Sequence, residues 1–344
     1  MNILIIKLSA IGDVVHTLPS LAAIRKRYPA AHITWVVEED ASDIIAGHPC
    51  LDRILVSRRK RWIRDLKRLS DVRETIGEIH TFVMSLRDRK YDLVVDFHGL
   101  LKSAVLVFLS RGERKVGYDS MQELSGLFLN EKVYEDMDKH AVDRYLDIAR
   151  HLDTPVHTPE FRIHIEEENQ KRVARLLEES GINGEDRFVA VNPVALWDTK
   201  MWENQKFAEL CDRIVGELKE KVVFTGGHED KTVKHIRSLM HHPSVDLTGR
   251  TTLRDLACLY ERAILVVTTD SGPMHVSAAV GTPTVALFGP TDPARTGPYG
   301  MGHTIVRAGL SCSPCFLKRC DTRQCMKDIT VEEVLQAVRK HGEQ

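Results

Sequence analysis

Residues 265–288 read LVVTTDSGPMHVSAAVGTPTVALF, and this stretch decides the fold class. A run of β-branched and apolar residues from Leu265 to Thr268 is followed by a turn and by a helical pattern that reaches about Val280. A second apolar run then covers Thr284 to Phe288. Two short buried strands joined by a helix form the βαβ unit of a parallel sheet. The stretch therefore predicts a parallel sheet that is covered by helices.

The same alternation of strands and helices extends along the chain. Further strand-like runs are Ile3 to Ile6, His32 to Val37, Leu93 to Phe97, Phe188 to Val191 and Val222 to Thr225. Helical patterns, with apolar residues at every third or fourth position, cover Val14 to Arg27, Glu167 to Ser180, Lys206 to Leu218 and Leu253 to Glu261. Such alternation is typical of a doubly wound α/β protein.

Chain length and a gap in the strand pattern predict two domains. The 344 residues exceed the usual domain size of roughly 100 to 200 residues. Strand character lapses from Tyr118 to Arg162 and returns near Phe188. We therefore expect one Rossmann-like, doubly wound domain over residues 1–170 and a second over residues 171–330, with a cleft between them. A final helix over residues 331–344 could pack back against the first domain.

Charge, hydropathy and missing motifs exclude several classes of protein. The formal net charge is −1, so no overall positive field attracts nucleic acid, and we expect no nucleic-acid partner. The longest apolar runs, such as Ala104 to Leu109, are far shorter than the roughly 18 residues of a membrane-spanning helix. Residues Met1 to Lys7 carry no basic leader and fit a buried first strand, which indicates a cytoplasmic protein. The sequence also lacks the GxGxxG, GxxxxGKS/T and HExxH motifs of dinucleotide oxidoreductases, P-loop enzymes and zinc proteases.

The turn between strand and helix in the opening stretch is the strongest candidate for a ligand site. Ser271 can cap the following helix, Pro273 suits its first turn, and Gly272 lets another group approach the backbone closely. Free amide groups at a helix N-terminus favour an anion, and His275 would lie near a bound diphosphate. The alternative is that Asp270 and Ser271 only cap a helix.

The first strand-to-helix connection, Lys7 to Val14, is a second candidate. It follows an apolar strand, and open α/β sheets bind ligands outside the carboxyl ends of their strands. Asp13 is a candidate general base, because a carboxylate that faces a cleft can accept a proton from an incoming hydroxyl. Its alternative role is that of a helix N-cap, for which aspartate is among the preferred residues.

Three loops of the second domain add polar groups at one sheet edge. Lys200, in the segment Asn192 to Trp202, could neutralise a leaving diphosphate, although a loop lysine is more often only solvated. Glu229, in the turn Thr225 to Glu229, could accept hydrogen bonds from a ribose. The glycine-bearing segment Gly281 to Thr291 follows a further strand. Loops gathered in this way favour a ligand site over independent structural roles.

A basic run lies between Arg58 and Arg68. It holds seven cations and a single acid, Asp65, with Trp62 between them. Cations in this number suit a phosphorylated or carboxylated partner, and beside an anionic membrane each would add about 1 kcal/mol to binding. A solvated helix face is the alternative.

Four cysteines cluster near the C-terminus, at Cys312, Cys315, Cys320 and Cys325. The first two have the spacing of a metal-binding pair, but four residues separate the members of each later pair. The pattern leaves a zinc or iron–sulfur site and a loop of reduced thiols both open.

The chain resembles the bacterial ADP-heptose:lipopolysaccharide heptosyltransferases over nearly its whole length. The paired signatures of that family are matched by Lys7 to Thr17, by Asp270 to His275 and by Gly281 to Thr291. Finer detail is most similar to the heptosyltransferase I branch, in the basic run and in Trp35 to Glu39, His98 to Ser103 and His140 to Arg144. The cysteine segment looks more like other branches, including heptosyltransferase II.

The resemblance implies a GT-B fold, in which two Rossmann-like domains face a cleft. It implies an inverting transfer of heptose from ADP-heptose, held by the C-terminal domain, to the Kdo or inner-core region of lipopolysaccharide. The transfer would need no metal or other cofactor. The acceptor would be Kdo-lipid A, so the protein would associate peripherally with the inner leaflet of the cytoplasmic membrane. The sequence does not indicate an oligomeric state.

The resemblance also implies roles for single residues. Asp13 would be the base that activates the acceptor hydroxyl, and Lys200 would stabilise the departing ADP. The donor-binding residues would be Glu229, Asp270, Ser271, Gly272 and His275. The acceptor-binding residues would be Arg58, Arg61, Arg64, Lys102 and His140. No residue would bind a metal.

Three alternatives stay open. The chain could be a heptosyltransferase II, another GT-B transferase or an epimerase that uses a different nucleotide sugar such as a UDP-sugar, or a non-catalytic relative. Nucleotide competition distinguishes ADP from UDP, and substitution of Asp13 distinguishes an enzyme from a silent relative.

Overall fold

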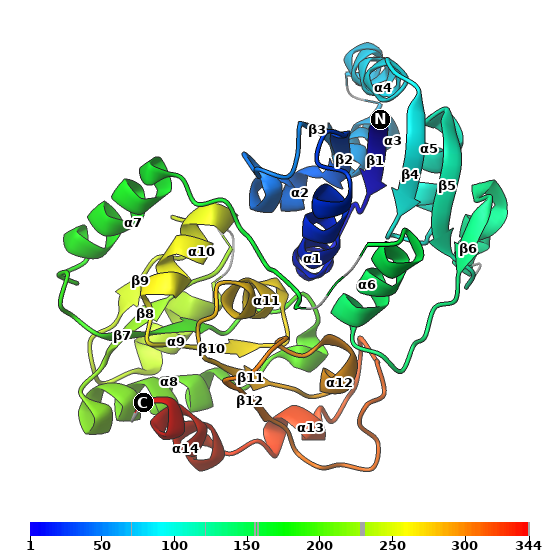
Figure 1. Ribbon diagram of the computed structural model, residues 1–344. Helices are drawn as coiled ribbons and strands as arrows, with labels where there is room; N and C mark the ends of the chain where they lie inside the picture. Colours follow the sequence, from blue (N-terminus) through cyan, green and yellow to red (C-terminus); the bar gives the residue numbers. More distant parts are fainter. Residues whose placement is uncertain (70, 121, 155, 157, 228–230, 343–344) are drawn as a thin grey trace. The chain divides into compact units, whose positions relative to one another are not determined.

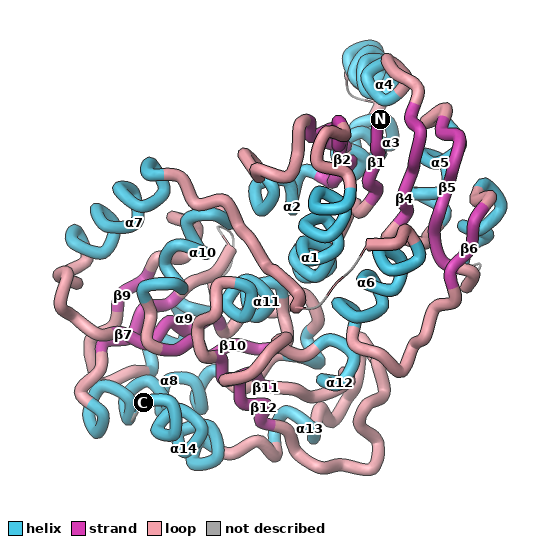
Figure 2. The backbone as a smooth tube through the Cα atoms, viewed as in Figure 1, coloured by secondary structure: helices cyan, strands magenta, loops and turns pink. Residues whose placement is uncertain are grey.

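The structure is a computed structural model that describes residues 1–69, 71–120, 122–154, 156, 158–227 and 231–342. The chain divides into two compact units, Met1–His164 and Ile165–Gln344. Each unit contains a parallel sheet of six strands that is flanked by helices (Figures 1 and 2). This confirms the predicted α/β class with two doubly wound domains.

The first unit has the strand order β3-β2-β1-β4-β5-β6. Its strands are β1 (Asn2–Ile6), β2 (His32–Glu38), β3 (Arg53–Ser57), β4 (Tyr91–Asp96), β5 (Gly112–Tyr118) and β6 (Glu131–Val133). Its helices are α1 (Ile11–Arg27), α2 (Glu39–Ser42), η1 (Asp43–Ile45), α3 (Arg59–Arg68), α4 (Val72–Leu86), α5 (Leu101–Leu109), η2 (Gln122–Phe128) and α6 (Ala141–His151). The chain runs outward from β1 to β3 and then adds β4 on the other side of β1, so the strand order reverses between β1 and β4.

Strand β1 forms the centre of this sheet because its sequence is almost entirely apolar. Residues 3–6 are fully buried, and Ile3 lies in register with Ile33 on one side and with Leu93 on the other. A strand that is covered on both faces needs a continuous apolar run. Helix α1 follows, with Asp13 in its first turn and three basic residues in its last turn, which complements the helix dipole.

The second unit has the strand order β12-β11-β10-β7-β8-β9, which reverses between β7 and β10. Its strands are β7 (Phe188–Asn192), β8 (Lys221–Phe224), β9 (Val245–Asp246), β10 (Leu265–Thr269), β11 (Thr284–Leu287) and β12 (His303–Val306). Its helices are α7 (Glu167–Glu179), η3 (Asp198–Lys200), α8 (Asn204–Arg213), η4 (Ile214–Leu218), α9 (Thr232–Leu239), α10 (Leu253–Arg262), α11 (Gly272–Ala279), α12 (Pro293–Thr296), α13 (Gln324–Lys327) and α14 (Val331–Gly342).

Helix α14 belongs to the core of the second unit. Its residues Val334, Leu335 and Val338 are buried together with apolar side chains of β7, β10 and β11. The apolar stripe of α14 is thus covered by the sheet of its own unit.

The boundary between the units differs from the predicted position after residue 170. The second unit starts at Ile165, ahead of α7. At the start of α7, Asn169 donates a hydrogen bond of 2.8 Å to the buried carboxylate of Asp255 in α10. This contact ties the whole of α7 to the second unit.

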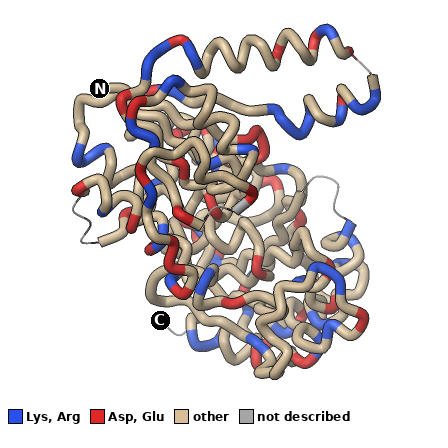
Figure 3. The backbone as a smooth tube through the Cα atoms, turned by 90° about the vertical axis from the view of Figure 1, so that its right-hand side faces the viewer, with Lys and Arg blue, Asp and Glu red and all other residues tan. Residues whose placement is uncertain are grey.

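Helices α3 and α4 form a hairpin that projects from the sheet of the first unit (Figures 1 and 3). Trp62 of α3 packs on Phe82 of α4 with ring centroids 5.4 Å apart, and its Nε1 donates a 2.8 Å hydrogen bond to Glu78. Lysine and arginine are concentrated on α3, the shorter helix of the hairpin in Figure 3. The helices that the structure describes include none with the length and hydropathy of a bilayer-spanning segment.

Candidate active site

Polar side chains gather in each unit at the point where the strand order reverses. In the first unit they follow β1 and β4, and in the second they follow β7 and β10. Open α/β sheets bind ligands at such reversal points, outside the carboxyl ends of the strands. The topology therefore favours one ligand position in each unit.

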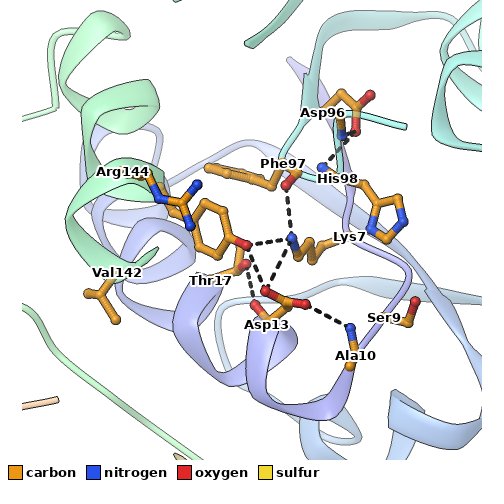
Figure 4. Close-up of polar contacts among 12 residues, drawn as sticks. Lys7, Ser9, Ala10, Asp13, Thr17, Asp96, Phe97, His98, Val142 and Arg144 are labelled. Carbon is orange, nitrogen blue, oxygen red and sulfur yellow. Dashed lines mark hydrogen bonds and ion pairs between the residues drawn. The ribbon is translucent and has the colours of Figure 1, made fainter. Parts of the chain in front are cut away.

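Lys7, which follows β1, is buried against three oxygen atoms (Figure 4). Its Nζ donates hydrogen bonds to the carbonyl oxygen of Phe97 at 3.0 Å and to the hydroxyl of Tyr145 at 2.6 Å. The same Nζ lies 3.8 Å from Oδ1 of Asp13. A buried ammonium group needs such partners because its desolvation is costly. The first strand, the loop after β4 and α6 together fix this cation.

Asp13 lies in the first turn of α1 and accepts hydrogen bonds with both carboxylate oxygens. Oδ2 accepts from the amide of Ala10 at 3.0 Å, and Oδ1 accepts from the hydroxyl of Tyr145 at 2.9 Å. The N-cap position belongs to Ala10, so the alternative role of Asp13 as the N-cap is wrong. The Asp13 side chain keeps 40% of its surface exposed, which leaves room for the hydroxyl of a ligand.

The surroundings of Asp13 favour its ionised form. Burial alone would raise the pKa of this carboxyl group, but the charge of Lys7, the amide of Ala10 and the hydroxyl of Tyr145 together lower it below the ordinary value of an aspartate. Burial raises the pKa of Tyr145 well above its ordinary value, so this hydroxyl remains a donor. At neutral pH the site therefore presents a carboxylate that can accept a proton.

The loop after β4 brings the ring of His98 to the same place. Asp96 orders this loop, because its Oδ1 accepts from the amide of His98 at 2.8 Å and its Oδ2 accepts from the hydroxyl of Ser103 at 2.7 Å. Burial and the charges of Lys7 and Lys102 lower the pKa of His98 to about 3, so the ring is neutral at pH 7. In the part of the chain that the structure describes, both ring nitrogens lack a hydrogen-bond partner. Figure 4 shows this ring beside Lys7.

Lys102 connects the Asp13 loop to a group of cations around Glu38. Its Nζ donates a 2.8 Å hydrogen bond to Oγ of Ser9 and lies 3.4 Å from Oε1 of Glu38. Arg59 approaches the same Oε1 at 2.9 Å, and Lys60 lies 3.9 Å from Oε2. One buried carboxylate therefore gathers three cations, and the positive excess favours an anionic ligand.

The three arginines predicted to bind the acceptor differ in their surroundings. Arg61 forms an ion pair with Glu78 of α4, so it stabilises the hairpin. Arg58 and Arg64 form pairs with neighbouring acids on the surface, and their side chains are 45% and 57% exposed. Exposed pairs of this kind are weak, so Arg58 and Arg64 can exchange their partners for an anion.

His140, the remaining predicted acceptor ligand, is the N-cap of α6. Its Nδ1 accepts a 3.2 Å hydrogen bond from the amide of Val142. Its ring packs edge-on against the ring of His16, with centroids 5.3 Å apart. The structure therefore gives His140 the role of starting the helix that carries Tyr145.

In the second unit, Asp270 holds Lys200 beyond the end of β10. Oδ2 of Asp270 lies 2.6 Å from Nζ of Lys200 and accepts a 2.5 Å hydrogen bond from Thr291. Lys200, in η3 after β7, also lies 4.6 Å from the ring centre of Trp197. Its side chain is 16% exposed, so the ammonium group is fixed and still accessible. The structure thus brings together the loops after β7, β10 and β11.

Helix α11 begins beside Asp270. Gly272 is its first residue, Pro273 lies in its first turn, and His275 follows with 8% of its surface exposed. Ser271 occupies the N-cap position, but its hydroxyl makes no cap hydrogen bond, and its buried Oγ has no hydrogen-bond partner among the described residues. The expected side-chain cap is therefore wrong, and the hydroxyl can donate to a ligand at the helix N-terminus.

The other candidates carry less information. Glu229 lies outside the described residues. All four clustered cysteines have free thiols, of which Cys312, Cys315 and Cys320 are exposed. Within the described ranges, no three His, Cys, Asp or Glu side chains come together as a metal site requires.

The sequence reading missed the partners of the charged groups. Tyr145 gave no signal, since it lies in an ordinary amphipathic helix. Lys7 did give one, because a lysine directly after a buried strand needs a polar partner. Glu38 gave a similar signal at the end of β2, where a carboxylate follows an apolar run.

Several glycosyltransferases match this chain. Residues 79–326 match the model of glycosyltransferase family 9 (heptosyltransferase). The chain is 30% identical to lipopolysaccharide heptosyltransferase 1 of Pseudomonas aeruginosa, over 95% of this chain and 90% of that protein. A family 9 glycosyl transferase from Veillonella parvula has a TM-score of 0.82 and 26% identity, over 99% of this chain and 97% of that chain. The E. coli heptosyltransferase WaaC with ADP has a TM-score of 0.77 and 25% identity, over 99% of this chain and 100% of that chain.

Proposed function

The chain belongs to glycosyltransferase family 9, the heptosyltransferases, and we therefore propose that it transfers heptose from ADP-heptose to the Kdo or inner-core region of lipopolysaccharide. Its two doubly wound units are those of the GT-B fold. Within the family we propose the activity of heptosyltransferase I, the name of the relative from Pseudomonas aeruginosa. The observation that carries the proposal is the ionised carboxylate of Asp13, held by Lys7 and Tyr145 and open to a hydroxyl. A lipid-linked acceptor places the enzyme at the inner face of the cytoplasmic membrane.

In this proposal Asp13 is the general base. It takes the proton of the acceptor hydroxyl as the oxygen attacks the anomeric carbon of the heptose. Attack from the face opposite ADP in a single displacement inverts the configuration at that carbon. Lys7 and Tyr145 keep the carboxylate oriented through the 3.8 Å and 2.9 Å contacts to Oδ1.

The second unit binds the donor in this proposal. Lys200 neutralises the charge that develops on the leaving ADP, and the amide of Gly272 with the hydroxyl of Ser271 donates to the diphosphate. His275 lies in the same helical turn. In the described part of the chain, both side-chain contacts of Asp270 use Oδ2, so its Oδ1 can accept from a heptose hydroxyl. Glu229 remains the proposed ribose partner, and the charge balance at the diphosphate comes from Lys200 without a metal.

Removal of the Tyr145 hydroxyl tests the arrangement around Asp13. Tyr145→Phe removes one of the groups that lower the pKa of Asp13, so that pKa rises and a smaller fraction of the carboxyl group is ionised in acid. We expect the activity of the variant relative to the parent enzyme to fall as the pH is lowered from about 6 to about 4, the range in which an aspartate near its ordinary pKa takes up a proton. Measurement of kcat/KM across this range checks the prediction. A constant ratio at every pH would contradict the proposed role of the hydroxyl.

Lys102 is the acceptor ligand with the clearest expected effect. Lys102→Gln removes a cation beside Ser9, four residues before Asp13, and we expect the KM of an anionic acceptor to rise about tenfold. The KM of ADP-heptose should not change. Arg61→Gln is the matched control, because Arg61 is paired with Glu78 and its loss should lower the melting temperature instead. Equal effects of the two variants on the acceptor KM would contradict the assignment of Lys102 to acceptor binding and of Arg61 to hairpin stability.

Acceptor-dependent release of ADP tests the function itself. Purified protein is incubated with ADP-heptose and Kdo-lipid A in the presence of EDTA, and the proposal expects ADP only when both substrates are present. Release that requires an acceptor already carrying one heptose would indicate heptosyltransferase II. Release of UDP from a UDP-sugar would indicate a different transferase. No release despite measurable binding of ADP-heptose would indicate a non-catalytic relative.

A further inference from the structure

An exposed apolar surface lies on the first unit, next to the residues assigned to the acceptor. Three side chains of α5 are exposed by about half, Leu101 at 51%, Val105 at 45% and Phe108 at 60%. Their spacing of four and three residues places them on one face of the helix. The opposite face of α5 is packed into the sheet, where Leu106 and Val107 are part of the core. The core of the first unit is therefore complete without the exposed face of α5.

Segment η2 extends this surface. Its exposed residues are Leu124 at 59%, Leu127 at 60% and Phe128 at 36%. The rings of Phe128 and Phe108 are in contact, with centroids 5.0 Å apart, so the two elements form one continuous area. We call these six side chains of α5 and η2 the apolar surface. Exposed apolar residues are normally scattered singly, and a contiguous group marks an interaction site.

Cations lie beside the apolar surface. Lys102 follows Leu101 directly, and its contact with Glu38 is shared by Arg59 of α3. The first turn of α5 therefore lies next to the first turn of the basic helix α3. Toward the end of α3, the exposed cations Arg64, Lys67 and Arg68 lie between two exposed apolar residues, Ile63 at 41% and the C-cap Leu69 at 81%. Figure 3 shows the lysines and arginines along this helix.

We propose that the apolar surface and the cations of α3 dock together on a bilayer that contains anionic lipid, which rests on the function proposed above. Apolar side chains enter the boundary between headgroups and acyl chains, while lysine and arginine remain at the level of the lipid phosphates. The position of the apolar surface fits a lipid-linked acceptor. The surface begins at Leu101, one residue before Lys102, whose Nζ contacts Ser9 in the loop before Asp13. A second copy of this chain is a poorer occupant, since self-association would bring two sets of α3 cations together.

The docking is tested by flotation with vesicles of equal parts phosphatidylcholine and phosphatidylglycerol. The triple variant Val105→Ser, Phe108→Ser, Leu127→Ser removes half of the apolar surface and leaves every proposed catalytic and binding residue in place. We expect its bound fraction to fall about tenfold or more. The matched control, Met301→Ser with Leu239→Ser, removes exposed apolar side chains of the second unit and should bind as the parent protein does. Vesicles of phosphatidylcholine alone should bind the parent protein more weakly.

Turnover measurements with two acceptors distinguish a loss of docking from a folding defect and from a failure of the proposed function. With a water-soluble Kdo acceptor that lacks acyl chains, the triple variant should match the parent enzyme, whereas with Kdo-lipid A in vesicles it should be slower. Unchanged vesicle binding by the triple variant would overturn the docking proposal. A change in oligomeric state, seen by sedimentation velocity, without a change in vesicle binding would overturn it in favour of a protein interface. If neither protein uses the soluble acceptor or Kdo-lipid A in vesicles but vesicle binding still depends on the surface, the proposed function fails and the docking stands.

Discussion

Asp13→Asn is expected to lower kcat by about a hundredfold to ten-thousandfold, the usual contribution of a general base. Binding of ADP-heptose should change by no more than a few fold, because the proposed donor residues lie in the second unit. An asparagine amide cannot accept the proton of the acceptor hydroxyl at neutral pH. Asparagine is preferable to alanine, because Lys7 is buried and needs an oxygen partner near the position of Oδ1.

Steady-state turnover, calorimetric binding of ADP-heptose and thermal melting together check this prediction. Asp138→Asn is the matched control, since Asp138 is an exposed carboxylate of the same unit, and its loss should leave turnover unchanged. If Asp13→Asn keeps turnover within a few fold of the parent enzyme, Asp13 is not the base. A large loss of thermal stability would instead assign the effect to the ion pair with Lys7.

Lys200→Gln is expected to lower kcat by about a hundredfold to a thousandfold, as the loss of one preorganised group at a developing charge usually does. The glutamine amide can still donate to Asp270, so the buried carboxylate keeps a partner. The positive charge beside the leaving diphosphate is lost. The KM of the acceptor should stay the same, because the change lies in the second unit, to which the proposal assigns the donor.

Lys318→Gln is the matched control for Lys200. The ammonium group of Lys318 lies 5.1 Å from the ring centre of Trp197, over the same indole as Lys200 at 4.6 Å. Among the described contacts, however, only Lys200 forms the ion pair with Asp270. We expect a change of a few fold in kcat for Lys318→Gln. Equal losses in the two variants would show that general positive charge over Trp197, rather than the fixed cation at Asp270, stabilises the leaving group.

The sequence predicted the central strands well and the strands toward the margins of each sheet poorly. The runs at Ile3 to Ile6, Phe188 to Val191 and Leu265 to Thr268 each became a central strand within one residue at either end. Strand β5 was missed because its sequence, GERKVGY, places three charged residues in a row, and β9 was missed because it has only two residues. Such strands form because a neighbouring strand offers backbone hydrogen bonds, and the hydrophobic pattern of the sequence does not reveal that neighbour.

The positions of the site loops followed from topology, but the contacts within them did not. Carboxyl ends of parallel strands meet at one edge of a sheet, so Asp13 and Asp270 could be placed there from the sequence. The partner of Asp13, Tyr145, is 132 residues away along the chain, and no periodic pattern links the two. Arg61 illustrates the same limit, since its pairing with Glu78 depends on how α4 folds back on α3.

The placement of α14 has a consequence for how genes of this kind recombine. Residues 1–164 form one compact unit, and residues 165–344, including α14, form the other. Each unit is therefore encoded by one uninterrupted segment. A single crossover near codon 165 would exchange the complete first unit between relatives, with no second exchange to restore a helix from the far end of the reading frame.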